Sequence, residues 1–200
     1  MTGPLAQSLI LIINTLAGVV IFAILLRFLL QASKADFYNP VSQAIVKGTS
    51  PLLRPFQKII PGYRNFDFAA LVLALVISSI TTTLMILLAG YALPDIGSII
   101  SWSFLGLLSL ILDIYFYGLL VSIIASWVAP YSGNPVILLI QQLMEPIQAV
   151  FRKVIPPLGG LDFSPIFIFL GIQVIEIMVI GTFARGLRLG GEAARYVIGI

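Results

Sequence analysis

The chain has 200 residues, of which 60% are hydrophobic and only 10% are charged. Soluble domains carry about 25% charged residues, so this composition, with a mean hydropathy of +1.10, excludes a water-soluble domain and indicates a membrane protein. The absence of Cys and His excludes disulfides, thiolate nucleophiles, His-based acid/base catalysis and ordinary zinc sites. A net charge of +3, with basic residues beside apolar segments, favours anionic lipid headgroups over nucleic acid as the partner.

Four apolar segments are long enough to cross a hydrocarbon core, which takes roughly 20 residues. They cover about 9–30, 68–92, 101–127 and 166–183. The first lacks a basic leader region, so we expect a retained span and not a cleaved signal peptide. Trp102 and Trp127 lie near opposite ends of the third segment, where interfacial aromatic residues are common.

An internal repeat organises the chain: residues 39–68 recur at 134–163 without a gap, each identical pair lying 95 residues apart. Each half, 1–95 and 96–200, therefore consists of a span, the repeated motif and a second span. The pairs that mark the repeat are Asn39 and Asn134, Pro40 and Pro135, Pro61 and Pro156, and Asp67 and Asp162.

The motif itself is amphipathic and too polar to span, which is typical of a helix in the plane of the membrane interface. Asn39 and Pro40 form a helix start, with Asn as the cap and Pro in the first helical position. Pro51 and Pro55 are expected to interrupt this helix. The sequence thus predicts an all-α membrane protein. It has four transmembrane helices in two parallel repeats, each with a short proline-broken pair of interfacial helices, over 39–60 and 134–155. Asp67 and Asp162 are expected to cap the spans that follow.

The distribution of basic residues predicts the orientation. Both motif loops lie on one side of the membrane, because two spans separate them. Together they carry Lys34, Lys47, Arg54, Lys58, Arg64, Arg152 and Lys153, against three arginines in the C-terminal tail. The positive-inside rule therefore places the motif loops in the cytoplasm and both termini outside.

These features resemble one known family. The segments DFYNPVSQAIVKGTSPLLRPFQKIIPG and IPPLGGLDFSP, with the NP…P…IP pattern occurring twice at equal spacing, are similar to the hallmark segments of the YggT family. Its members are small integral membrane proteins of the bacterial inner membrane, with two copies of this repeat and relatives in plastids. The resemblance implies a link to osmotic-stress tolerance and potassium homeostasis in bacteria, and to cytochrome assembly and nucleoid distribution in plastids. It brings no catalytic residues.

The motif loops are the first candidate site. Their cations, Lys47, Arg54, Lys58, Arg152 and Lys153, either pair with lipid phosphates and anchor the bundle or form a paired platform for a partner protein or a specific lipid. Where Arg54 and Pro55 stand in the first copy, the second has Ala149 and Val150, so it carries less positive charge.

Asp113 and Glu176 are the second candidate site, because each falls near the middle of an apolar segment, where ionisable residues are costly. They are either a cation or proton site, assisted by Tyr115, Gln173 and the hydroxyls of the second span, or protonated packing residues. Their repeat counterparts, Gly18 and Thr81, are not acidic, which argues against a pathway through one monomer.

Arg27 is expected to extend along the first span towards the membrane surface, a carboxylate partner or a headgroup being the alternative. No catalytic, metal-binding or phosphate-binding constellation is present, so we expect neither enzymatic activity nor a cofactor. The leading hypothesis is that the protein organises or assists assembly of other membrane components. A homo-oligomer is compatible with this hypothesis. The rival is a component of potassium or proton transport.

Overall fold

The computed structural model describes residues 3–129, 132–155, 162–187 and 196–199. Within these ranges the chain is helical and contains no β-strand, only an isolated bridge between Tyr63 and Phe66. Four helical segments are long and apolar enough to cross a membrane. They are α1 (Pro4–Ala32), α3 (Phe68–Leu88), α4 (Ile96–Val128) and a last span made of α6 (Ser164–Ile175), the π-helical η1 (Glu176–Ile180) and α7 (Gly181–Gly186). The predicted all-α architecture is confirmed.

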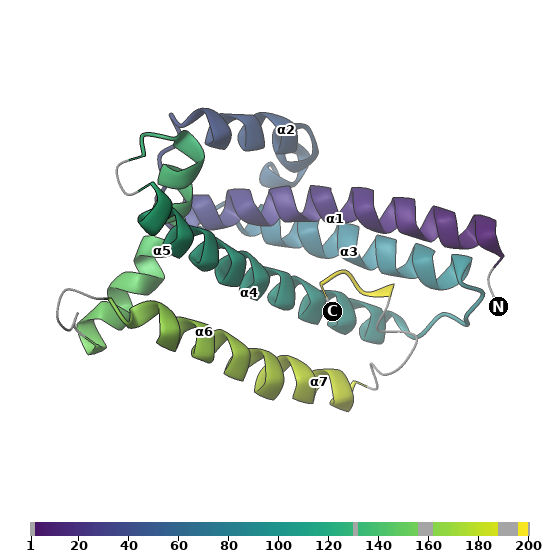
Figure 1. Ribbon diagram of the computed structural model, residues 1–200. Coiled ribbons are helices and arrows are strands. Elements are labelled where there is room, and N and C mark those ends of the chain that lie inside the picture. The colour runs from purple at the N-terminus through teal and green to yellow at the C-terminus, as the bar shows by residue number, and fades with distance from the viewer. Residues whose placement is uncertain (1–2, 130–131, 156–161, 188–195, 200) are drawn as a thin grey trace.

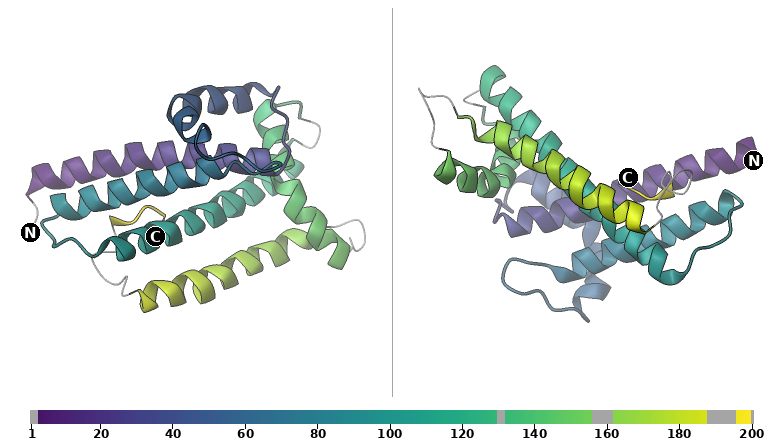
Figure 2. Two further views of the ribbon diagram at one scale, coloured as in Figure 1. Left: turned by 180° about the vertical axis from the view of Figure 1, so that it is seen from behind. Right: turned by 90° about the horizontal axis from the view of Figure 1, so that it is seen from below.

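Two shorter helices, α2 (Pro40–Gln57) and α5 (Pro135–Val154), connect the spans within each half. Both lie at the end of the bundle opposite the N-terminus, which we call the motif end (Figure 1). α1 and α3 run side by side, α4 packs against α3, and the last span lies along α4. Seen from below, the α1–α3 pair crosses the direction of α4 and α6 at an angle (Figure 2).

Small residues bring the spans together. Ala70 and Ala74 of α3 are fully buried one turn apart and form part of one core with Ile21, Ile24 and Leu25 of α1. Close approach over small residues is the common way for helices to associate in lipid, where dispersion contacts replace the hydrophobic effect. The outward faces remain apolar and exposed, as a lipid-facing surface requires.

The motif helices correct one expectation. α2 is a single helix that contains both Pro51 and Pro55, and α5 likewise contains Pro146, so neither copy is a broken pair. All three prolines lie on exposed positions, so the missing backbone hydrogen bonds do not face the protein interior. The opposite side of α2 is anchored by buried Thr49 and Leu53, and this packing keeps the helix in one piece.

The start of α4 is set by Asp95, earlier than the expected start near Ser101. The Ser98 backbone N–H donates to Asp95 Oδ1 at 3.0 Å, and the Ser98 hydroxyl donates to Oδ2 at 2.6 Å. These hydrogen bonds, the hydroxyl's first, hold the pKa of the Asp95 carboxyl below its ordinary value, because they favour the ionised form.

Trp102 is not the surface anchor that the sequence predicted, whereas Trp127 is 81% exposed. The Trp102 side chain is buried, and its indole N–H donates to the Leu187 carbonyl at 3.2 Å. Tertiary packing at the end of the last span therefore overrides the interfacial preference of this residue.

A short C-terminal segment, 196–199, returns to lie beside α4 (Figure 1). Val197 and Ile198 are buried there. The approach is so close that a Cβ atom at Gly106 would collide with the Ile198 backbone oxygen. Gly106 is thus required by packing, since only glycine lets the two backbones meet at this point.

Candidate functional site

The two motif copies form one continuous surface at the motif end. The Asn39 side-chain amide donates to the Pro135 carbonyl at 2.7 Å, and the Gln142 side-chain oxygen accepts a hydrogen bond from the Asp36 backbone N–H at 2.8 Å. Both bonds join residues about a hundred positions apart in the chain. They fix the start of α2 against α5.

The same local cap serves both copies but in different surroundings. Asn39 accepts from the Val41 N–H at 2.8 Å, and Asn134 accepts from the Val136 N–H at 2.9 Å, which satisfies a free donor of each helix start. Pro40 and Pro135 occupy the first helical positions, as predicted. Asn39 is buried whereas Asn134 is exposed, and of these two side chains only the Asn39 amide bonds to the other copy among the described residues.

On α2, at its C-terminal end and on α5, four cations are exposed, and we call the surface that they form the motif face: Lys47, Arg54, Lys58 and Lys153. Within the described part of the chain none of the four forms an ion pair. Arg152 differs from them, because its guanidinium donates to Glu145 at 2.6 Å and to Gln148 at 3.3 Å and lies 3.7 Å from Asp162. It is engaged within the protein and leaves the motif face to the other four.

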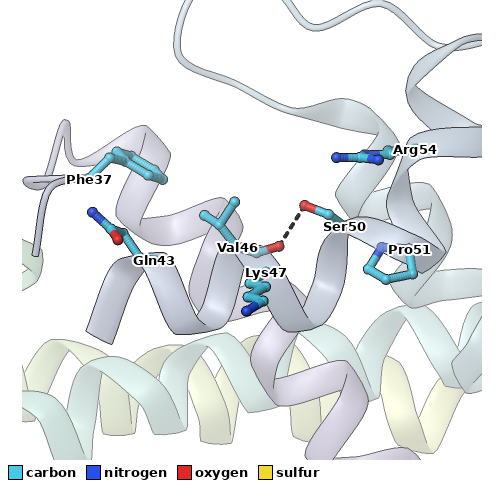
Figure 3. A pocket seen from close by; sticks show the side chains of 7 residues that line it. All are labelled: Phe37, Gln43, Val46, Lys47, Ser50, Pro51 and Arg54. Carbon is cyan, nitrogen blue, oxygen red and sulfur yellow. Dashed lines mark hydrogen bonds between the residues drawn. The ribbon is translucent and has the colours of Figure 1, made fainter. Parts of the chain in front are cut away.

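A hollow of about 570 Å³ lies along the polar side of α2 (Figure 3). Gln43, Lys47, Ser50 and Arg54 line it at helical spacing, with Phe37 at one end. The Ser50 hydroxyl donates to the Val46 carbonyl at 2.6 Å. With two cations and no acidic residue in its lining, the hollow favours an anionic group.

Asp67 and Asp162 stand before the second span of each half, as the repeat predicted. The Asp162 carboxylate accepts from the Ser164 N–H at 2.8 Å, but the N-cap position of α6 is held by Phe163, so Asp162 is not the cap that the sequence predicted. Asp67 occupies the corresponding position, but its carboxylate accepts from the Gln57 side chain at 2.6 Å and makes no cap hydrogen bond. Pro61 is exposed after α2, and Pro156 lies outside the described residues.

The structure also brings Asp113 and Glu176 into the same neighbourhood, between α4 and the last span. Glu176 opens the π-helical turn η1, and its carboxylate accepts from the Ser109 hydroxyl at 2.9 Å. Ser109 lies one helical turn before Asp113 on α4, so Asp113 and Glu176 lie in the same region of the bundle. π-helical turns are frequent at functional sites.

Two of the predicted assistants of this pair are Tyr115 and Gln173, and among the described residues neither hydrogen-bonds to either carboxylate. Tyr115 instead borders a small cavity beside Met144 of α5, and Gln173 is exposed on α6. No group of three or more acidic side chains that could hold a metal ion occurs in the described ranges.

Arg27 is the residue that the sequence interpretation misjudged. Its guanidinium does not extend to the membrane surface but donates to Thr49 Oγ1 and Ser50 Oγ, both at 3.0 Å, and to the Val46 carbonyl at 3.3 Å. Arg27 therefore fixes the first span to the first motif helix. The adjacent hydroxyls of Thr49 and Ser50 were the available signal, since a buried guanidinium needs several acceptors.

These features define a class: a multi-pass, four-span membrane protein built from a duplicated span–amphipathic helix–span unit. The CCB3/YggT family model matches residues 6–88 and 101–183, one match for each half. The chain belongs to this family, as its motifs predicted.

Curated relatives match over most of their length. An uncharacterized protein of Pseudomonas aeruginosa is 45% identical over 181 residues, covering 90% of this chain and 92% of the relative. An uncharacterized protein of Vibrio alginolyticus, described as lying in the proC 3' region, is 38% identical, covering 86% and 94%. The uncharacterized protein YggT of Escherichia coli K12 is 33% identical, covering 86% and 89%. No solved structure matches the chain.

Proposed function

We propose that this protein is a non-catalytic organiser of the bacterial inner membrane, which assists assembly of other membrane components through the motif face. The observation that carries the proposal is the set of four exposed cations that form no ion pair with any described residue, held on two helices that are hydrogen-bonded to each other. Such a surface fits acidic segments of membrane proteins or anionic headgroups. The link to osmotic-stress tolerance comes from the family resemblance alone.

The test compares two sets of substitutions in a strain that depends on this chain after osmotic upshift. Under the proposal, Arg54→Gln, Lys58→Gln and Lys153→Gln together abolish rescue, while Asp113→Asn with Glu176→Gln leaves it intact. Arg185→Gln, which removes an exposed arginine at the opposite end of the bundle, is the matched control. Rescue by the triple variant would contradict the proposal, and loss of in vivo crosslinks from the motif face would support it.

The second candidate function is potassium or proton transport, favoured by the proximity of Asp113 and Glu176 beside a π-helical turn. It predicts flux into liposomes that contain the purified protein. The Asp113→Asn, Glu176→Gln pair should abolish this flux and the triple variant of the motif face should not. Absence of flux from folded, reconstituted protein would eliminate it.

The proposed orientation places the motif face in the cytoplasm and both termini outside. Because the chain has no Cys, a single cysteine at Lys58 or at Ser8 reports its own side of the membrane. We expect a membrane-impermeant thiol reagent to label the Ser8→Cys protein in intact spheroplasts and the Lys58→Cys protein only after lysis. The reverse labelling pattern would show that the orientation is the opposite one, and it would not contradict the fold.

A further inference from the structure

Because the two halves are repeats, corresponding positions can be compared, and the comparison shows that one arginine lies at a different position in each half. Arg27 of α1 corresponds to Ser122 of α4, whereas Gln57 of α2 corresponds to Arg152 of α5. Each half thus carries one arginine and one repeat aspartate where its first span, motif helix and second span meet. The arginine comes from the span in the first half and from the motif helix in the second.

In the first half this junction is filled. The Arg27 side chain crosses from α1 to α2, where it hydrogen-bonds to Thr49 and Ser50. Leu53, on the same side of α2, is fully buried. Asp67 is buried and hydrogen-bonded to Gln57, so its carboxylate is not available to a ligand.

In the second half the corresponding space is open. The short Ser122 side chain leaves a hollow of about 590 Å³ between the end of α4, α5 and the start of α6. Ligand pockets in proteins have volumes of about 300–1,000 Å³. Ser122, Ser126, Gln148 and Asp162 give this hollow its polar groups, and Gln148 replaces the buried leucine of the first half. We call it the α4–α6 hollow.

The charges around the α4–α6 hollow favour a cationic group. Among the described residues that line it, Asp162 is the only charged one. Arg152 is turned mainly towards Glu145, at 2.6 Å against 3.7 Å for Asp162. The Asp162 side chain is 36% exposed, so its carboxylate can accept further hydrogen bonds. A positively charged donor at this carboxylate would offset its negative charge.

The position of the hollow indicates what carries that group. It lies where two membrane spans reach the motif end, and Ile123 and Ile166 on those spans form its apolar walls. A molecule that fits is amphiphilic, with a polar head at the level of Asp162 and an apolar chain along α4 and α6.

We propose that the α4–α6 hollow binds a phospholipid whose headgroup carries a primary ammonium. The ammonium donates to Asp162, the Ser122 hydroxyl donates to a phosphate or ester oxygen, and an acyl chain follows Ile166. The first half cannot bind such a lipid in the same place because Arg27 occupies it. This site lies apart from the cations of the motif face, so it does not depend on their role in assembly.

Native mass spectrometry of the full chain in detergent tests the proposal. Phosphatidylethanolamine and phosphatidylcholine with identical acyl chains carry the same charges, but the three N-methyl groups of the second leave it with no ammonium N–H to donate. We expect wild-type protein to bind the first about tenfold more tightly, as befits a charge-assisted hydrogen bond. Asp162→Asn, which retains an oxygen for the Ser164 N–H, should abolish this preference. Ser122→Arg should fill the hollow as Arg27 does and weaken binding of both lipids, whereas Ser8→Arg, at an exposed position near the other end, should not.

Equal binding of the two lipids by wild-type protein would overturn the proposal, and this comparison needs no variant. An undiminished preference in Asp162→Asn, or unchanged lipid binding in folded Ser122→Arg, would also overturn it. Displacement of the lipid by free ethanolamine at equal concentration would assign the hollow to a soluble amine and refute the lipid assignment.

Discussion

Arg27 shows how one side chain can determine the position of a whole element. Three hydrogen bonds from its guanidinium hold α2 against α1, and the acceptors on α2 are two hydroxyls and a carbonyl. The amphipathic pattern alone predicts a helix that lies on the bilayer by its apolar side. This polar attachment was not predictable from periodicity, because Thr49 and Ser50 become buried only when a donor from another helix reaches them.

Replacing Arg27 with Met keeps an unbranched, flexible side chain but removes every donor. Thr49 and Ser50 then lose their partner in a half-buried site, and we expect the free energy of unfolding to fall by about 2 kcal/mol. Arg54→Met, at an exposed position of the same helix, should change it by less than about 0.5 kcal/mol. Unfolding in denaturant, followed by circular dichroism in one detergent, measures both. Equal losses of unfolding free energy in the two variants would mean that Arg27 contributes only its charge and not its hydrogen bonds.

At the scale of elements, the sequence predicted the four spans and both motif helices, but it wrongly predicted that the motif helices are interrupted. Prolines were expected to break α2, whereas tertiary packing on its opposite side keeps it whole. The C-terminal segment was not anticipated either, because four apolar residues carry no pattern. Its only signal was Gly106 within a span, and a single glycine there has several explanations.

Gly106→Ala tests the docking of that segment. The added methyl group would meet the Ile198 backbone, so we expect a loss of about 1–3 kcal/mol, or displacement of the segment and its earlier cleavage by carboxypeptidase. Gly171→Ala in α6 is the control, since nothing lies near its added methyl, and it should stabilise its helix by up to about 1 kcal/mol. A similar gain for both substitutions would show that the segment is not docked at Gly106.

For the molecule as a whole, the repeat predicted the topology of both halves but not how they differ. Identical residues received different surroundings: Asn39 is buried between the halves and Asn134 is exposed. A sequence repeat implies equal local structure, whereas the contact between copies forms once and cannot serve both members of a pair. Of the candidate sites, the sequence predicted that Asp113 and Glu176 lie at a similar depth in the membrane, but not that they lie near each other. The hydrogen-bond partners of Arg27 and Arg152 could not be predicted without the fold.

Paired substitutions at these asparagines measure the junction between the halves. Asp caps a helix as well as Asn does, so Asn134→Asp should leave the free energy of unfolding within about 0.5 kcal/mol of wild type. Asn39→Asp keeps the cap but loses the donor to Pro135 and buries a charge beside its carbonyl, so we expect a loss of about 2–3 kcal/mol. Unfolding in denaturant measures both variants. Equal losses of unfolding free energy would show that the hydrogen bond from Asn39 to Pro135 does not hold the halves together.

In both halves the first span is longer than the second. The first span of each half has 29 or 33 residues and the second has 21 or 23. At 1.5 Å per residue the longer helices reach about 44–50 Å and the shorter ones about 32–35 Å, against a hydrocarbon core of about 30 Å. α1 and α4 must therefore tilt or project, while α3 and the last span match the bilayer. Because α2 and α5 pack against the longer helices, a thicker or thinner membrane would change the height of the motif end relative to the lipid surface.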